Sequence, residues 1–196
     1  FYNLYGPTEA AVEITAQQIV DVDESATSVP IGTPIWNSSA MVLDSRLHRV
    51  PDGVAGELYV GGVQLARGYS ARPDLTAERF IANPYGAPGS RLYRTGDVVR
   101  RRGDNRLEYL GRTDFQVKLR GQRVELGEIE AVMGRAPGIV HTVATVHENA
   151  NGDQHLVGYY SPASVPADLI AQTLRAVLPG YMVPAVWMGL DEVVLN

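Results

Sequence analysis

Glycine and proline divide this chain into short segments. The 196 residues include 20 glycines and 12 prolines, a combined share somewhat above average usage. Both residues favour turns, because glycine adopts backbone conformations that other residues avoid and proline fixes one backbone dihedral. This spacing favours a turn-rich fold that contains β-structure over a helical bundle.

The first 113 residues are predicted to be loops followed by short strands. Before residue 40 the apolar stretches are brief and are interrupted by glycine and proline, which predicts loop and turn rather than long elements. Beyond that point the pattern predicts strands at 41–43 and 57–60, a helix at 73–82, and a hairpin of 98–100 with 107–110. We expect residues 1–113 to form a loop-rich segment that leads into a small β-barrel or curled sheet.

The pattern changes after Asp114. Alternating apolar and polar residues predict a half-buried strand at 115–119, and apolar residues at helical spacing predict a helix across 126–133. The remainder is predicted to contain three further strands, at 139–146, 156–160 and 185–195, and a second helix at 166–178. We expect residues 114–196 to form a small α+β unit, so the fold class of the whole chain is α+β.

Composition excludes several kinds of function. The 17 basic and 22 acidic residues give a net charge of −5, which argues against a general nucleic-acid-binding protein. The absence of cysteine excludes disulfides, thiolate metal sites and cysteine nucleophiles. No apolar run approaches the roughly 20 residues of a membrane helix, and no signal-peptide pattern opens the chain. We expect a cytoplasmic protein with no nucleic-acid or membrane partner.

The four histidines show no spacing typical of metal ligands. His141 and His147 are expected on the same face of one strand, but nothing else joins them. We interpret them and the other two, His48 and His155, as structural or surface residues.

A polar loop near the start of the chain could bind a nucleotide. Between Asn3 and Glu9, an aromatic ring at Tyr5 could stack on a base, Thr8 could bond a phosphate oxygen, and Glu9 could hold Mg²⁺. The alternative is an ordinary turn, in which Thr8 caps a short helix and Glu9 lies in its first turn.

Two further segments carry groups that suit a nucleotide. Asp97 follows Thr95 and Gly96 in what we expect to be a tight turn. Its carboxylate could accept hydrogen bonds from both ribose hydroxyls, or it could merely accept hydrogen bonds from backbone N–H groups of the turn. Residues 111–130 are dense in charge, and Lys118 on the expected strand could neutralise phosphate. The alternative for this segment is a solvated strand and helix with interleaved charges.

The order and wording of these motifs identify a family. The chain resembles the C-terminal portion of a nonribosomal peptide synthetase adenylation domain, in the superfamily shared with acyl-CoA synthetases and luciferases. The resemblance covers essentially the whole chain. It rests on six strings in family order: NLYGPTE at 3–9, GELYVGGVQLARGY at 56–69, RPDLTAERF at 72–80, YRTGD at 93–97, GRTDFQVKLRGQRVELGEIE at 111–130 and LPGYMVP at 178–184.

The resemblance implies roles for the first polar loop. Asn3 would meet the adenine amino group and Tyr5 would stack on the base, with Gly6 in the same cofactor-binding loop. Thr8 would contact the α-phosphate of ATP, and Glu9 would be the metal ligand, for Mg²⁺.

The resemblance also implies roles for residues further along the chain. Tyr109 would stack on the base, Asp97 would hold the ribose hydroxyls, and Arg112 would reach the ribose and phosphate region. Asp114 matches the hinge about which the small C-terminal subdomain, residues 114–196, rotates, and Lys118 would approach nucleotide or phosphopantetheine as that subdomain turns. The implied catalytic residues are Thr8, Glu9, Arg112 and Lys118.

The implied reaction has two steps. An amino-acid carboxylate attacks the α-phosphate of ATP and releases pyrophosphate, and a phosphopantetheine thiol on a carrier-protein domain then takes the aminoacyl group. The first residue is Phe1 rather than methionine, and the chain stops before the family's terminal catalytic-lysine motif. We therefore expect a fragment that needs the remainder of the adenylation core and is inactive alone.

Two other functions stay open at this point. An acyl- or aryl-CoA ligase of the same superfamily is the nearer alternative, and a non-catalytic folded fragment that only binds partners is the other. Of the family's substrate-pocket positions, the chain contains those that match Leu4, Val12 and Glu13. A carboxylate at Glu13 would suit an amino acid with a polar or cationic side chain.

Overall fold

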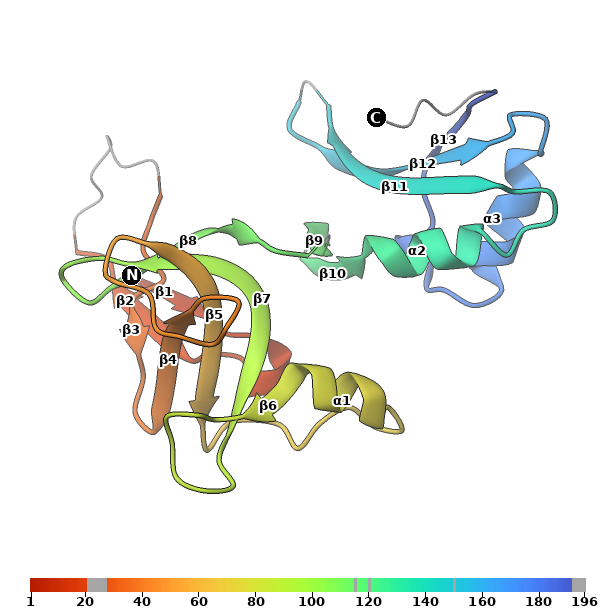
Figure 1. Ribbon diagram of the computed structural model, residues 1–196. Helices are drawn as coiled ribbons and strands as arrows, with labels where there is room; N and C mark the ends of the chain where they lie inside the picture. The colour runs from red at the N-terminus through yellow and green to blue at the C-terminus, as the bar shows by residue number, and fades with distance from the viewer. Residues whose placement is uncertain (21–27, 115, 120, 150, 192–196) are drawn as a thin grey trace. The chain divides into compact units, whose positions relative to one another are not determined.

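The computed structural model describes residues 1–20, 28–114, 116–119, 121–149 and 151–191. The chain divides into two compact units, Phe1–Asp114 and Phe115–Asn196. Each unit has its own core and is described by itself (Figure 1).

The first unit is built on a five-stranded antiparallel sheet. The long, curved strand β7 (Arg91–Arg101) lies in its middle and pairs with β5 (Ala55–Gly62), β6 (Phe80–Ala82) and β8 (Leu107–Arg112) (Figure 1). Strand β4 (Ser38–Leu43) completes the sheet by pairing with β5. The predicted hairpin of β7 and β8 is confirmed, and both strands are longer than expected.

A second, three-stranded sheet forms from the first 34 residues. Strand β1 (Tyr2–Tyr5) pairs with β2 (Thr15–Gln18), which pairs with β3 (Thr33–Pro34), all antiparallel. The 3₁₀ helix η1 (Thr8–Ala10) lies between β1 and β2. The expectation of loop and turn here is wrong for β1 and β2, because pairing between the two strands compensates for the weak strand propensity of their asparagine and glutamine residues.

The predicted helix at 73–82 is shorter in the structure. Helix α1 (Pro73–Arg79) ends where β6 begins, and Phe80 pairs with Tyr93 of β7. Phe80 is buried in the core of this unit, together with Leu58, Val60 and Tyr93. Burial of the aromatic ring and the ladder hydrogen bonds outweigh the helical pattern of the sequence at this point.

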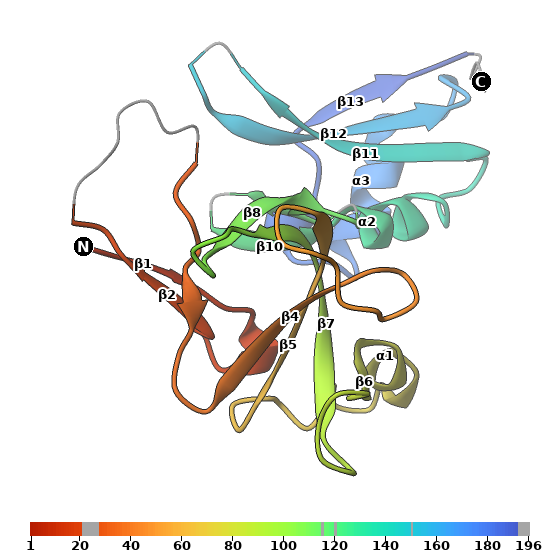
Figure 2. The same cartoon turned by 60° about the vertical axis from the view of Figure 1, so that its left-hand side comes forward.

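The second unit is a sheet with helices on one side. Strands β11 (His141–Glu148) and β12 (Gln154–Ser161) are antiparallel, and β13 (Val186–Gly189) pairs parallel with β12. Helices α2 (Leu126–Met133) and α3 (Ala167–Arg175) lie on the same side of this sheet (Figure 2). Their apolar faces share one core with the sheet, which includes Ile129, Met133, Ile170 and Leu174.

A small hairpin precedes α2. Strand β9 (Gln116–Leu119) confirms the strand predicted at 115–119 over its described residues. It pairs with β10 (Gln122–Glu125), a strand that the sequence pattern did not predict. Phe115 of the predicted first strand and residues 192–195 of the predicted last strand lie outside the described residues. Among the described helices, none has the length and apolarity that crossing a membrane requires. The chain is a mixed α+β structure, as predicted.

Candidate functional site

The carboxylate of Asp97 lies at the centre of a polar network in the first unit. Asp97 is on β7 and is 6% exposed. The hydroxyl of Tyr5, at the end of β1, donates to Asp97 Oδ2, and Nη1 of Arg112, at the end of β8, donates to Oδ1. The fold thus brings together three predicted site residues, of which Tyr5 and Asp97 are 92 positions apart.

Arg112 also binds the carboxylate of Asp114. Its Nε and Nη2 donate to the two Asp114 oxygens at 2.6 and 2.9 Å, and Nη2 also donates to the carbonyl oxygen of Thr95 at 3.0 Å. Arg79, at the end of α1, adds an ion pair to Asp114 at 3.5 Å. The guanidinium of Arg112 therefore links the Asp97 carboxylate to the last residue of the first unit.

Gly96 is the residue that allows this packing. It has a φ of +77°, and a Cβ there would lie 2.5 Å from Asp114 Oδ2 and 2.9 Å from Arg112 Nη2. The predicted tight turn at 95–97 is wrong, since these residues lie inside β7. The pairing of β7 with β5 skips them, from Tyr59 opposite Arg94 to Glu57 opposite Val98, so they form an irregularity in a continuous strand.

The tyrosines near Asp97 stay protonated. Burial, and then the Asp97 carboxylate, raise the pKa of Tyr5 far above its usual value. The same two causes raise the pKa of Tyr109, which lies on β8 and is 40% exposed. Tyr5 is therefore a hydrogen-bond donor to Asp97 at neutral pH, and the Tyr109 ring is partly open to solvent.

Glu9 lies in a second cluster of the first unit. Its side chain belongs to η1 and is buried at 8% exposure. The hydroxyl of Tyr69 donates to Glu9 Oε1 at 2.6 Å and lies 3.3 Å from the hydroxyl of Tyr93. Thr8, the preceding residue, is exposed.

A single carboxylate suits magnesium only with additional oxygen ligands. The described residues contain no group of three or more metal-ligating side chains. Mg²⁺ typically takes one or two protein carboxylates together with substrate phosphates and water. Glu9 fits that arrangement, in which a bound triphosphate supplies the remaining oxygens.

The backbone of the loop between β1 and β2 packs closely against itself. Ala11 and Val12 have φ values of +54° and +79°, which are unusual for residues with a side chain. A Cβ at Gly6 would lie 2.5 Å from the Val12 carbonyl oxygen and 2.6 Å from Glu13 Cα. Gly6 therefore lets the chain pass close beside itself at Val12 and Glu13, and its role in cofactor binding stays a prediction.

The predicted pocket residues differ in exposure. Leu4 is 53% exposed and Val12 is 77% exposed, while Glu13 is half-buried. Within the part of the chain that the structure describes, no hydrogen bond or ion pair involves the Glu13 carboxylate. Asn3 on β1 donates through Nδ2 to the carbonyl oxygen of Pro30 at 2.9 Å, which fixes the orientation of its amide.

Lys118 belongs to the second unit. It lies on β9 opposite Arg123 of β10, and Gly121, with a φ of +78°, lies in the connection between them. The structure thus gathers Tyr5, Asp97, Arg112 and Asp114 in one unit, and Lys118 is a residue of the other.

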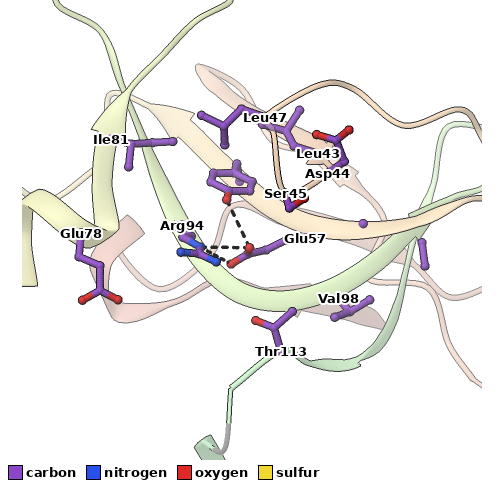
Figure 3. A pocket seen from close by; sticks show the side chains of 13 residues that line it. Leu43, Asp44, Ser45, Leu47, Glu57, Glu78, Ile81, Arg94, Val98 and Thr113 are labelled. Atoms are coloured by element: carbon purple, nitrogen blue, oxygen red, sulfur yellow. Dashed lines mark hydrogen bonds and ion pairs between the residues drawn. The ribbon is translucent and has the colours of Figure 1, made fainter.

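A cavity of about 640 Å³ in the first unit contains none of the predicted site residues (Figure 3). Inside it the Glu57 carboxylate accepts from Nε of Arg94 at 2.9 and 3.0 Å and from the Tyr59 hydroxyl at 3.3 Å. The hydrogen bond to Glu57 raises the pKa of Arg94, and burial, followed by Glu57, raises the pKa of Tyr59 to about 12. The i, i+2 spacing of Glu57 and Tyr59 on a strand was the available signal for this pair.

Sequence reasoning also missed Tyr69, Tyr93 and Arg79. Each lies within a motif, but its contact is distant in the sequence. Tyr69 bonds Glu9 across 60 positions, Tyr93 lies beside Tyr69 across 24 positions, and Arg79 of α1 pairs with Asp114, which follows β8. No local spacing pattern reports such contacts, so only the fold reveals them.

The chain is similar in sequence and in fold to known proteins. The family model described as AMP-binding enzyme matches residues 1–70. A dimodular nonribosomal peptide synthase from Bacillus subtilis is 49% identical over 196 residues, which are 99% of this chain and 8% of that protein.

Two solved structures are similar across nearly the whole chain. One is a nonribosomal peptide synthetase protein containing adenylation and PCP domains, with 32% identity, a TM-score of 0.83, and coverage of 99% of this chain and 39% of that one. The other is the Vibrio cholerae adenylation domain AlmE in complex with glycyl-adenosine-5'-phosphate, with 29% identity, a TM-score of 0.82, and coverage of 98% and 37%. The chain therefore spans less than half the length of each of these relatives.

Proposed function

The chain belongs to the AMP-binding enzyme family, among nonribosomal peptide synthetase adenylation domains, and we propose that its parent protein activates an amino acid with ATP. The observation that supports this most strongly is the convergence of Tyr5 and Arg112 on the buried Asp97 carboxylate. This network joins three of the family's motifs at one point.

The Asp97 network is proposed to bind the nucleoside. Asp97 accepts hydrogen bonds from the two ribose hydroxyls, while Arg112 balances its charge and Tyr5 fixes its orientation. The Tyr109 ring offers an open face for the adenine, since base stacking needs an exposed aromatic surface. Asn3 commits its amide N–H to Pro30, so its amide oxygen is the group that accepts from the adenine amino group.

The loop at Thr8 and Glu9 is proposed to face the phosphates. The exposed Thr8 hydroxyl donates to an α-phosphate oxygen, and the Glu9 carboxylate holds Mg²⁺. Bound Mg²⁺ supplies neutralisation of the phosphate charge. Glu9 contributes a fixed carboxylate, because its burial and its bond to Tyr69 restrict its movement.

The chemistry consists of two substitutions. A substrate carboxylate oxygen attacks the α-phosphorus of ATP, the bond to the β-phosphate oxygen breaks, and pyrophosphate leaves. A phosphopantetheine thiol then loses its proton to solvent and attacks the acyl carbon, the bond from that carbon to the phosphate oxygen breaks, and AMP leaves. The contribution of the chain is positioning and charge stabilisation rather than covalent catalysis.

The second unit is proposed to act in the second step. We assign Asp114 as the hinge between the large core and the small subdomain, and Lys118 with Gly121 as the part that approaches nucleotide or pantetheine. A similar structure contains adenylation and PCP domains, which supports a carrier domain as the partner that accepts the aminoacyl group.

The substrate is proposed to carry a polar or cationic side chain. Glu13 is half-buried, and its carboxylate has no ionic partner among the described residues, so a cationic side chain would supply one. Leu4 and Val12 would provide the apolar part of the pocket.

Pyrophosphate exchange tests the proposal. We expect the full-length protein to incorporate labelled pyrophosphate into ATP when one amino acid is present, and the Asp97→Ala variant to lose this exchange. Formation of coenzyme A thioesters from fatty or aryl acids, with no response to any amino acid, would instead assign the protein to the CoA-ligase branch.

A further inference from the structure

Residues from four of the motifs meet in one cluster beside Glu9. Glu9 itself belongs to NLYGPTE, Tyr69 closes GELYVGGVQLARGY, and Tyr93 opens YRTGD. Phe80, the last residue of RPDLTAERF, packs between the two tyrosines, with ring centroids 5.6 Å from Tyr69 and 5.1 Å from Tyr93. Tyr69, Phe80 and Tyr93 have no proposed contact to the nucleotide or the metal, so their place in this cluster requires a different explanation.

The segment that carries Tyr69 is fixed to Glu9 by its backbone as well. The amide of Ala66 donates to the Glu9 carbonyl oxygen at 2.8 Å, three residues before the Tyr69 hydroxyl reaches the Glu9 carboxylate at 2.6 Å. Two bonds of different kinds thus fix this segment against η1.

Helix α1 holds the other end of the same segment. The Thr76 hydroxyl accepts from the Tyr69 amide at 2.9 Å and donates to the Arg72 carbonyl oxygen at 2.8 Å. Gly68, with a φ of +145°, admits this contact, since a Cβ there would lie 2.4 Å from Thr76 Cγ2. The Tyr69 backbone is therefore held by α1 in addition to the bond between Ala66 and Glu9.

The Tyr69 hydroxyl donates a charge-assisted hydrogen bond to the Glu9 carboxylate. The Tyr93 side chain is fully buried, and its hydroxyl lies 3.3 Å from the Tyr69 hydroxyl. This neighbour limits the directions in which the Tyr69 hydroxyl can point.

We propose that Tyr69, supported by Tyr93 and Thr76, is a positioning residue that orients the Glu9 carboxylate toward a divalent cation. This proposal rests on the proposed function of Glu9 as the Mg²⁺ ligand. Partners that orient a metal ligand are typically worth about 10- to 100-fold in metal affinity or activity. The motif residues around Glu9 then serve the metal ligand without contacting the nucleotide.

The test measures cation affinity directly. Mn²⁺ is titrated into the full-length protein saturated with a non-hydrolysable ATP analogue, and free Mn²⁺ is followed by electron paramagnetic resonance. We expect Tyr69→Phe to weaken Mn²⁺ binding about tenfold or more, and Tyr93→Phe to weaken it less. The matched control is Tyr59→Phe, which removes a tyrosine–glutamate hydrogen bond at Glu57 in the same unit and should leave Mn²⁺ affinity unchanged.

The outcomes distinguish this proposal from the proposed function of Glu9 as the Mg²⁺ ligand, on which it rests. If Glu9→Gln weakens Mn²⁺ binding and Tyr69→Phe does not, Glu9 keeps its role and the positioning proposal is overturned. If Glu9→Gln leaves Mn²⁺ affinity unchanged, both are overturned. The melting temperature of each variant is measured as well. A loss of Mn²⁺ affinity in Tyr69→Phe supports the proposal only if its melting temperature is unchanged. If Tyr69→Phe unfolds, the same criterion applies to Tyr93→Phe.

Discussion

Arg112 approaches Asp114 side-on, with Nε and Nη2 each donating to a separate carboxylate oxygen at 2.6 and 2.9 Å. This bidentate pairing leaves Nη1 to donate to Asp97. One guanidinium therefore fixes two carboxylates at the same time, one in the proposed ribose site and one at the boundary of the two units.

Replacement of Arg112 by lysine tests this geometry. Lysine keeps the charge but lacks the planar fork, so it cannot bond both carboxylates in the same way. We expect Arg112→Lys to weaken ATP binding by the full-length protein about 10- to 100-fold, as measured by calorimetry. The control is Arg100→Lys, which alters a single arginine–glutamate contact at Glu108; equal affinities of the two variants would refute the prediction.

Gly96→Ala is expected to destabilise the first unit. The variant combines a left-handed φ with a steric overlap at Asp114 Oδ2, together about 3 kcal/mol in the free energy of unfolding. Gly53→Ala is the matched control, because Gly53 has a similar φ of +82° and no atom within 4 Å of the added Cβ. We expect the control to lose about 1 kcal/mol, and urea denaturation of the chain measures both. Losses of the same size would show that the close approach at Gly96 has no energetic weight.

Acid should destabilise the first unit partly through Glu108. The hydrogen bond from Arg100, and then the one from Ser28, hold the pKa of Glu108 below its ordinary value. A carboxylate with a lowered folded-state pKa contributes stability above its unfolded pKa and loses that contribution as the pH falls through the folded value. We expect Glu108→Gln to flatten the decline in stability below about pH 4.5, and Ser28→Ala to flatten it less, in urea denaturation at successive pH values. A decline as steep in Glu108→Gln as in the original chain would exclude this source.

Glu13→Leu is expected to change substrate preference. Leucine removes the half-buried carboxylate that is proposed to pair with a cationic side chain. In pyrophosphate exchange by the full-length protein, the ratio of rates with cationic and aliphatic amino acids should fall about tenfold or more. Glu148→Leu, on β11 of the second unit, controls for the general loss of an acidic residue. An unchanged ratio in Glu13→Leu would remove Glu13 from the pocket.

Local patterns in the sequence predicted much of the fold. The β7–β8 hairpin and helix α2 follow from turn residues and from apolar spacing that act over a few positions. The failures occurred where distant segments decide the local conformation. Helix α1 stops at Arg79 because Phe80 pairs with Tyr93, and 95–97 stay in strand because β5 pairs with β7 on either side of them.

The residues of the site were also predictable only where local sequence features report them. Asp97 and Arg112 stood out because their residue types suit a nucleotide and their motifs resemble a known family. Tyr69 did not stand out, because its contact with Glu9 joins residues 60 positions apart and depends on the packing of Thr76 against Gly68. A hydrogen bond of this kind exists only once α1 and η1 have both folded.

The close contact at Gly6 has a consequence for chimeric enzymes. The backbone of Val12 and Glu13 rests against Gly6, and Ala11 and Val12 hold left-handed conformations to reach it. A transplant that exchanges Val12 and Glu13 alone would impose foreign side chains on a backbone path made for these residues. An exchange of the whole loop from Gly6 to Glu13 would instead transfer both sides of this contact together.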